Sequence, residues 1–150
     1  MIARIKKIVQ VGVFHNFTSG GTLSFHENGK MTVVFGRNRK GKTTLSSILQ
    51  SLGSGNAELI NNRLSIPSDT TLSRQIEISY KDGDTEDTIL FTPTGWNSTD
   101  LKGRVLVFDQ DFVQKNLMLG NDITRENKEN LTDFILGEDG VKKSEDIGVR

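Results

Sequence analysis

A glycine-containing stretch in the first third of the chain has the residue types of a loop that grips phosphate groups. Gly36, Gly41, Lys42 and Thr43 match the pattern G-x-x-x-x-G-K-[ST]. In such a loop the glycines let backbone N–H groups turn toward phosphate oxygens. The lysine places an ammonium between the β- and γ-phosphates, and the hydroxyl of the last residue ligates Mg²⁺. The pattern therefore predicts a site for a nucleoside triphosphate with Mg²⁺.

Two cations occupy the middle of this loop, at positions where many such loops carry a glycine and a small residue. The side chains of Arg39 and Lys40 either add charge toward phosphate, extend into solvent, or stiffen a turn that requires a positive φ. We favour solvated side chains. The expected nucleotide-binding set is Gly36, Arg37, Asn38, Arg39, Lys40, Gly41, Lys42, Thr43 and Thr44.

The segments on either side of the loop predict how it is positioned. "MTVVF" at residues 31–35 is typical of a buried strand, and residues 43–52 have a helical apolar period, so the helix N-terminus would face the anion. Upstream, residues 2–14 alternate as a strand. Asn28-Gly29 predicts a hairpin that joins residues 22–25 to residues 31–35.

The second half of the chain adds strands and one acidic residue of interest. Residues 75–92 predict a hairpin with Asp82-Gly83 at its turn, in which three apolar side chains of one strand face two of the other. Residues 105–108 resemble a buried strand, which is followed directly by Asp109 and Gln110. Helical patterns at residues 112–119 and 131–135 lead into a charged C-terminal segment. For Trp96 and Phe14 we favour core packing over a lid or an adenine contact.

Bulk composition excludes several classes of protein. The 150 residues correspond to about one domain. Lys plus Arg and Asp plus Glu each number 19, which excludes a globally basic protein that coats DNA. The absence of Cys excludes disulfides, thiolate zinc sites and Cys nucleophiles. No apolar stretch is long enough for a membrane span or a signal peptide, so we expect a cytoplasmic protein without a membrane partner.

The loop resembles that of a known family. "GRNRKGKTTL" is similar to the G-x-N-G-x-G-K-[ST]-T-L loop of ABC-type ATPase heads, in the branch that includes structural-maintenance-of-chromosomes (SMC) proteins, RecF and SbcC. It departs from that pattern at Arg39 and Lys40. "RVLVFDQDFVQKNL" and "FILGEDGVKKSEDI" look like the AAA ATPase segment of RloC/PrrC-type anticodon nucleases. The resemblance spans nearly the whole chain.

This resemblance implies an architecture and a set of partners. Residues 1–150 would be the N-terminal lobe of an α/β P-loop NTPase head, with a mixed sheet, an antiparallel β-subdomain and a helix after the phosphate loop. The coiled coil and the C-terminal lobe, which carries the signature motif and the Walker B acids, would be missing. The cofactors would be ATP and Mg²⁺. Expected partners are a second head in a homodimer or the chain's own C-terminal lobe, with nucleic acid or a partner nuclease in DNA repair, nucleic-acid processing or anti-phage defence.

Asp109 and Gln110 allow three interpretations. In the family interpretation, Gln110 is the Q-loop residue, and its amide oxygen meets Mg²⁺ and the attacking water, so that Lys42 and Gln110 are the catalytic pair. Alternatively, Asp109 ends a Walker B strand and holds Mg²⁺, as a carboxylate beside a hard cation should. The third interpretation is a core strand that ends in a polar turn. Two rival functions accordingly stay open, a compact self-sufficient NTPase and a non-catalytic nucleotide-sensing module.

Overall fold

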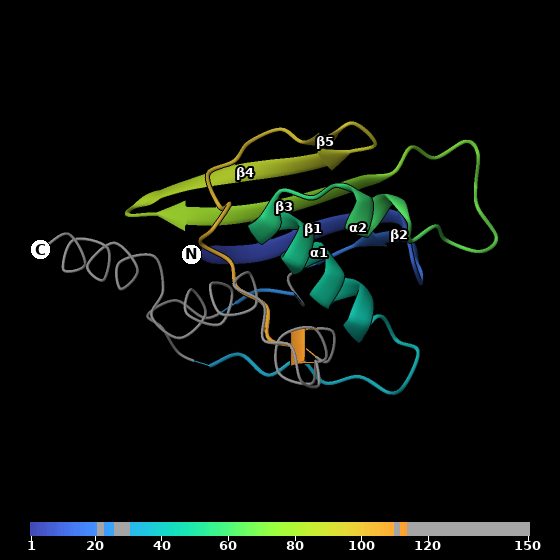
Figure 1. Cartoon of the computed structure of the whole chain (residues 1–150), viewed down its shortest axis with the longest axis horizontal. Helices are drawn as coiled ribbons and strands as arrows, with labels where there is room; N and C mark the ends of the chain where they lie inside the picture. Colours follow the sequence, from blue (N-terminus) through green and yellow to red (C-terminus); the bar gives the residue numbers. More distant parts are fainter. Residues whose placement is uncertain (21–22, 26–30, 110–111, 114–150) are drawn as a thin grey trace, which may run out of the picture.

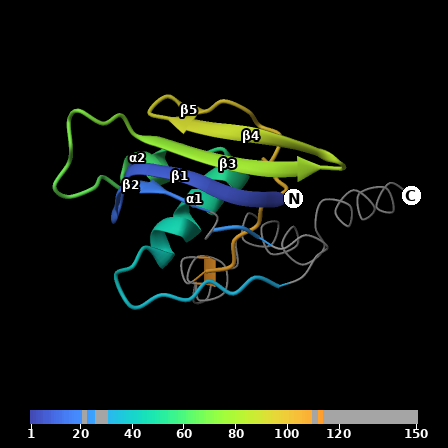
Figure 2. The ribbon, with the colours of Figure 1, turned by 180° about the vertical axis from the view of Figure 1, so that it is seen from behind.

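A five-stranded antiparallel sheet is the largest element of the fold. The computed structural model describes residues 1–20, 23–25, 31–109 and 112–113. The strands are β1 (Ile2–Val11), β2 (Phe14–Thr18), β3 (Gln75–Asp82), β4 (Thr85–Thr92) and β5 (Gly95–Trp96). They lie in the order β2-β1-β3-β4-β5. Two helices, α1 (Lys42–Ser54) and α2 (Glu58–Asn61), lie on one face of this sheet, as the two opposite views show (Figures 1 and 2).

The core lies between this face and α1. Alternating residues of β3 and β4 point toward the helix, as the period of two in a strand requires. The core residues of β1 are spaced by three instead, because the register between β1 and β3 shifts between Ile5 and Lys7. Ile48 and Leu52 of α1 and Ile60 of α2 meet them. The sheet residues that belong to this core are Ile5, Ile8, Val11, Ile76, Ile78, Tyr80, Ile89 and Phe91. Their removal from water is the main force that holds α1 to the sheet.

The predicted hairpin of residues 75–92 is confirmed. β3 pairs with β4 from Ile76↔Phe91 to Asp82↔Thr85. Gly83 at the turn has φ 62, a conformation that glycine adopts without steric cost. The core packing predicted for Trp96 is also confirmed, because its ring lies 5.1 Å from that of Phe91 and its Nε1 donates to Ser51 Oγ at 3.0 Å.

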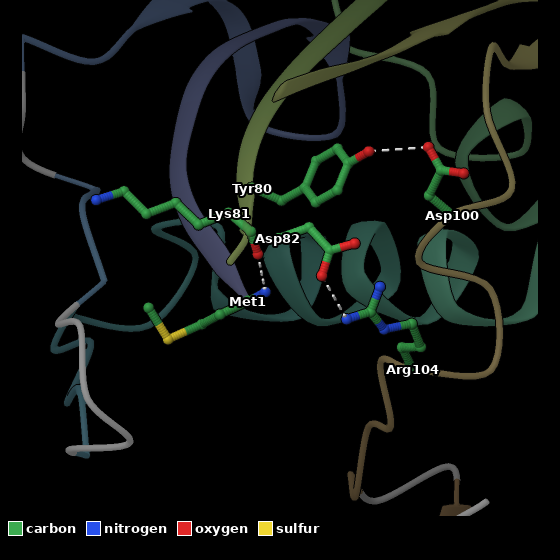
Figure 3. Close-up of polar contacts among 6 residues, drawn as sticks. All are labelled: Met1, Tyr80, Lys81, Asp82, Asp100 and Arg104. Carbon is green, nitrogen blue, oxygen red and sulfur yellow. Dashed lines mark hydrogen bonds and ion pairs between the residues drawn. The ribbon is translucent and has the colours of Figure 1, made fainter. Parts of the chain in front are cut away.

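Polar contacts close one end of this sheet (Figure 3). Tyr80 Oη donates to Asp100 Oδ2 at 2.8 Å, and Arg104 forms an ion pair with Asp82 at 3.5 Å. Backbone bonds between Met1 and Lys81 extend the β1–β3 ladder by one residue. The hydrogen bond to Asp100 raises the pKa of Tyr80, and the hydroxyls of Ser98 and Tyr80 together lower the pKa of Asp100.

The single strand predicted for residues 2–14 is wrong in one respect. The chain reverses at Gly12 and Val13, so that β2 pairs antiparallel with β1 through Val11↔Phe14. Gly12 has φ 55, and Gln10 shares this left-handed conformation at φ 55 although it has a side chain. Alternation alone did not reveal the reversal, because both arms of the tight turn continue the apolar pattern.

Two predicted buried strands are not strands in the structure. Residues 31–35 and 105–108 are extended but belong to no ladder, and residues 23–25 pair with the start of β1 instead of with residues 31–35. Within the described residues no strand pairs with them, and several of their large apolar side chains are exposed, whereas Val105 packs against the core. We call this exposed set the open apolar face: Met31, Val33, Phe35, Leu106 and Phe108.

The structure confirms three predictions: the α/β class, the antiparallel β-unit and the helix after the loop. The predicted mixed sheet is not observed, because every strand pair in the described sheet is antiparallel. Asn28-Gly29, Gln110 and the helical patterns beyond residue 113 lie outside the described residues. Within the described ranges, no helix combines the length and the apolar character that crossing a membrane requires.

Candidate nucleotide-binding site

The predicted phosphate loop leads directly into α1. Gly41 is the N-cap residue of this helix, and its φ of 93 lies in the left-handed region. No side chain caps the helix, and its first turn contains no acidic residue. The first backbone N–H groups of α1 therefore have neither a side-chain cap nor a carboxylate within their own turn of the helix. Such a helix end, with its partial positive charge, favours an anion.

A cavity of about 360 Å³ lies at this helix end. That volume falls in the range of small-molecule sites, about 300–1,000 Å³. Six of the nine predicted nucleotide-binding residues line it, together with one residue of the β1–β2 turn: Asn38, Arg39, Gly41, Lys42, Thr43, Thr44 and Val13. The donor set combines helix amides, an ammonium and the hydroxyl of Thr43 at an exposed position. This chemistry fits a triphosphate with a Mg²⁺ that the phosphates share.

The Lys42 side chain is folded back across the loop. Its Nζ donates to Gly36 O at 2.5 Å and to Arg37 O at 3.0 Å. These two bonds place Gly36 and Arg37 around the ammonium, although neither residue lines the cavity. An ammonium carries three donors, so one remains for a ligand. The two carbonyls thus position the Lys42 ammonium beside the backbone of the loop.

The middle of the loop is strained at one residue. Arg39 has φ 63, and its neighbour Lys40 closes a turn through a bond from its N–H to Arg37 O at 3.3 Å. The Arg39 and Lys40 side chains are both exposed, as predicted. The left-handed conformation costs a residue with a side chain about 1–2 kcal/mol. Arg39 therefore stands at the position where the related loops have a glycine, and it adopts the backbone that a glycine would prefer.

The β1–β2 turn supports the loop from the side. A Cβ at Gly41 would lie 2.5 Å from the ring of Phe14, and a Cβ at Gly12 would lie 2.6 Å from Thr44 Oγ1. Neither site has room for a side chain, so the two segments are in direct contact. Phe14 also packs against the hydrophobic core. Sequence reasoning considered Phe14 as an adenine contact but missed Gly12 and Val13 as part of the site, because nothing in the residue pattern places residue 13 beside residue 41.

Asp109 lies against α1. Its Oδ2 accepts a hydrogen bond from Ser46 Oγ at 2.9 Å, and its Oδ1 accepts from the Phe112 N–H at 3.0 Å. Its backbone oxygen accepts from the Val113 N–H at 3.0 Å, which completes the pattern of a helix N-cap. Ser46 is one helical turn beyond Thr43, so the structure brings Asp109 toward the phosphate-loop helix. Gln110 is not among the described residues, so its role and that of Asp109 stay predictions.

Comparison with known proteins supports the interpretation of the loop as part of an ATPase domain. A family model described as an AAA domain matches residues 10–149, which is nearly the whole chain. The chain therefore belongs to this AAA-domain family, whose members are AAA-type, SMC/RecF-like ATPases that generally bind ATP and Mg²⁺. No curated protein matches the sequence significantly. The finer resemblance to RloC/PrrC-type ATPases stays a prediction.

Proposed function

We propose that this chain is the N-terminal, ATP-binding lobe of an SMC/RecF-like ATPase head. The observation that carries the proposal is the cavity at the uncapped N-terminus of α1, which is lined by residues of the phosphate-loop motif. Backbone N–H groups of residues 36–44 and the Lys42 ammonium would neutralise the phosphates. The Thr43 hydroxyl would ligate Mg²⁺. Bound Mg²⁺ supplies charge neutralisation across the β- and γ-phosphates.

Catalysis in this lobe alone would be slow. Residues 36–44 include no carboxylate or histidine that could act as a general base for water. Gln110, our candidate for contact with Mg²⁺ and water, can orient water but is a poor base. In the intact assembly two heads would close around the nucleotide, and the signature motif of the opposing head would complete each site. Hydrolysis would then drive a conformational change in DNA repair, nucleic-acid processing or anti-phage defence, with nucleic acid or a nuclease as partner.

The open apolar face supports the proposal that a second body of protein covers this lobe. Met31, Val33 and Phe35 are 84%, 74% and 91% exposed, and they directly precede the phosphate loop. Leu106 and Phe108 are about half exposed in the other unpaired segment. Residues 105–109 alternate between half-buried and exposed, as a strand with one free face does. The C-terminal lobe, or a second head, would supply the missing neighbours.

Binding of ATP to the purified chain tests the core of the proposal. Titration calorimetry with Mg²⁺ is expected to detect binding that Lys42→Ala weakens at least about tenfold, the scale of losing one charge-assisted contact of about 1.5–3 kcal/mol. Lys102→Ala, a change of another lysine outside the loop, is the matched control and should bind as the parent does. Failure of the parent chain to bind ATP would refute the proposal.

A compact, self-sufficient NTPase is the second candidate, because the hydrogen bond from Ser46 brings Asp109 to the phosphate-loop helix. In that case Asp109 would act as the Walker B acid, Asp109→Asn would abolish turnover and Gln110→Ala would have a mild effect. The family interpretation predicts the reverse order. Rapid turnover by the isolated chain that depends on Lys42 would favour the compact enzyme. A nucleotide-sensing module would instead assemble with ATP and release no phosphate.

A further inference from the structure

We propose that Ser65 is a positioning residue for the phosphate loop, and that it acts through the β1–β2 turn. The inference rests on the proposed function, since it concerns the same phosphate site. Ser65 lies in the segment between α2 and β3, which has neither helical nor strand periodicity. Its side chain is 1% exposed. The proposal has two steps, from Ser65 to the turn and from the turn to the loop.

The first step is a shared hydrogen bond. Ser65 Oγ lies 2.8 Å from Gly12 O and 3.2 Å from Phe14 O, so the single O–H donor of this buried hydroxyl is shared between the two carbonyls on either side of Val13. The neighbouring Arg63 adds a backbone bond, in which its O accepts from the Gly12 N–H at 2.8 Å. The turn is thus held on both its N–H and its C=O side by one short segment.

The same segment also holds Gln10, which lies two residues before the turn. Gln10 is 5% exposed and left-handed, a conformation that a residue with a side chain keeps only when its surroundings impose it. Its Oε1 accepts from the Asp69 N–H at 3.1 Å, and its backbone O accepts from Arg74 Nε at 3.3 Å. Residues 63–74 therefore fix the backbone of residues 10–14 at several points.

The second step is van der Waals contact. The Phe14 ring and Val13 Cγ2 occupy the space beside Gly41, where an added Cβ would lie only 2.5 Å and 3.0 Å from them. Gly12 meets Thr44 in the same way. Gly41 must keep its left-handed backbone for the following amides to face the cavity. A turn that shifts away from Gly41 would release that backbone, and the amides would no longer converge on one anion.

The structure offers a matched control in Ser51. Both serines are almost fully buried, and both donate from Oγ to a backbone carbonyl, which for Ser51 is Asn56 O at 2.7 Å. Ser51 contacts Trp96 at the far end of α1 and does not line the phosphate cavity. Truncation to alanine should therefore lower the stability of the fold at either site, while only Ser65 should affect the phosphate loop.

The experiment compares the parent chain with Ser65→Ala and Ser51→Ala by calorimetry, using MgATP and inorganic tripolyphosphate with Mg²⁺ as ligands. We expect Ser65→Ala to raise the Kd of both ligands about fivefold, the scale of one lost hydrogen bond, and Ser51→Ala to leave both within about twofold. Two ligands are compared because tripolyphosphate has the phosphates of ATP but no base. If Ser65→Ala disturbed a contact with the base, only the binding of ATP would weaken.

Three results would overturn the proposal: equal weakening by both variants, no weakening by Ser65→Ala, or weakening that is confined to ATP. If Ser65→Ala does not fold, Ser65→Cys keeps the size of the side chain and weakens the donor, and a loss of about two- to threefold for both ligands is then expected. Absence of binding to the parent chain, or binding that Lys42→Ala leaves intact, would instead refute the proposed function.

Discussion

The two sides of α1 differ in how completely they are covered. Toward the sheet, Ile48 and Leu52 meet a layer in which Ile76, Ile78 and Phe91 are fully buried. Toward the other side lie two extended segments, residues 31–35 and 105–108, which have no ladder partner among the described residues and expose large apolar side chains. The same helix thus packs against a buried core on one side and lies next to an exposed apolar surface on the other.

This difference suggests that the sheet side of α1 maintains the fold, whereas the uncovered side is available for function. The sheet side can hold α1 in place without further partners, since the apolar surface between the sheet and α1 is buried. The uncovered side carries the segments that enter and flank the phosphate loop. A surface of this kind commonly marks a contact with other protein. Binding of phosphate would then depend on the lobe itself, whereas turnover would depend on what covers the open apolar face.

The sharpest test of the comparison replaces one phenylalanine on each side. Phe91→Ala removes a fully buried ring and should lower the free energy of unfolding by about 3–5 kcal/mol. Phe35→Ala, at a 91% exposed position, should change it by less than about 0.5 kcal/mol. Urea denaturation measures both. A large loss of stability at Phe35 would mean that the open apolar face is already covered in the isolated chain.

The junction between the two sides depends on Gly53. A Cβ there would lie 2.0 Å from Val105 O, and the Gly103 N–H bonds to Gly53 O at 2.8 Å. Gly53→Ala should therefore cost about 1–3 kcal/mol in unfolding free energy, in spite of the higher helix propensity of alanine. Hydrogen exchange of the Gly103 amide should accelerate.

The control for this change is Gly20→Ala, because nothing lies within 4 Å of a Cβ at Gly20. Its stability should stay near that of the parent chain. A Gly53→Ala protein as stable as the parent, with Gly103 still protected, would show that residues 103–105 do not depend on close approach to α1.

A smaller effect is expected within the phosphate loop. Arg39→Gly relieves the left-handed backbone and should raise the free energy of unfolding by about 0.5–1 kcal/mol. Lys40→Gly, one residue along and without a positive φ, should instead lower it slightly, because glycine gains freedom in the unfolded chain. Thermal denaturation of the two variants gives the comparison. Equal effects would mean that the strain at Arg39 is not relieved by glycine.

The smallest effect concerns the end of the sheet shown in Figure 3. Because the pKa of Asp100 is lowered on folding, the unfolded state binds more protons as the pH falls below the usual value of 3.8. Stability from this carboxylate is present above that pH and is lost as the pH falls further. Asp100→Asn should flatten the dependence of unfolding free energy on pH between about pH 5 and 3. Parallel curves for parent and variant would contradict this.

Tyr80 should act in the opposite direction at high pH. The hydrogen bond to Asp100 raises the pKa of Tyr80 in the folded protein. The contribution of Tyr80 to the free energy of unfolding is therefore present below the usual pKa of 10.0, and it is lost as the pH rises through the higher pKa of the folded state. Tyr80→Phe should therefore reduce the alkaline loss of stability in urea titrations between about pH 9 and 11. An unchanged alkaline limb would mean that another group titrates there.

Local patterns in the sequence predicted those elements whose structure is determined by residues close together in the chain. Asp82-Gly83 with alternating isoleucines specified the β3–β4 hairpin, and the motif followed by a helical period specified α1 with Gly41 at its start. "MTVVF" and residues 105–108 have strand composition, but a strand also needs a neighbour, and composition carries no information about one. Ser65 illustrates a different limit, since its contacts with Gly12 and Phe14 join segments that are far apart in the chain.

The position of Trp96 has a practical consequence. It is the only tryptophan in the sequence, and it joins β5 to the second half of α1 through Ser51. Its emission is therefore an intrinsic optical reporter of whether α1 stays docked on the sheet. Because the ring is at the end of α1 remote from Gly41, a change in its fluorescence during nucleotide titration would register movement of the whole helix, and a silent signal during a positive calorimetric titration would locate the response in the loop.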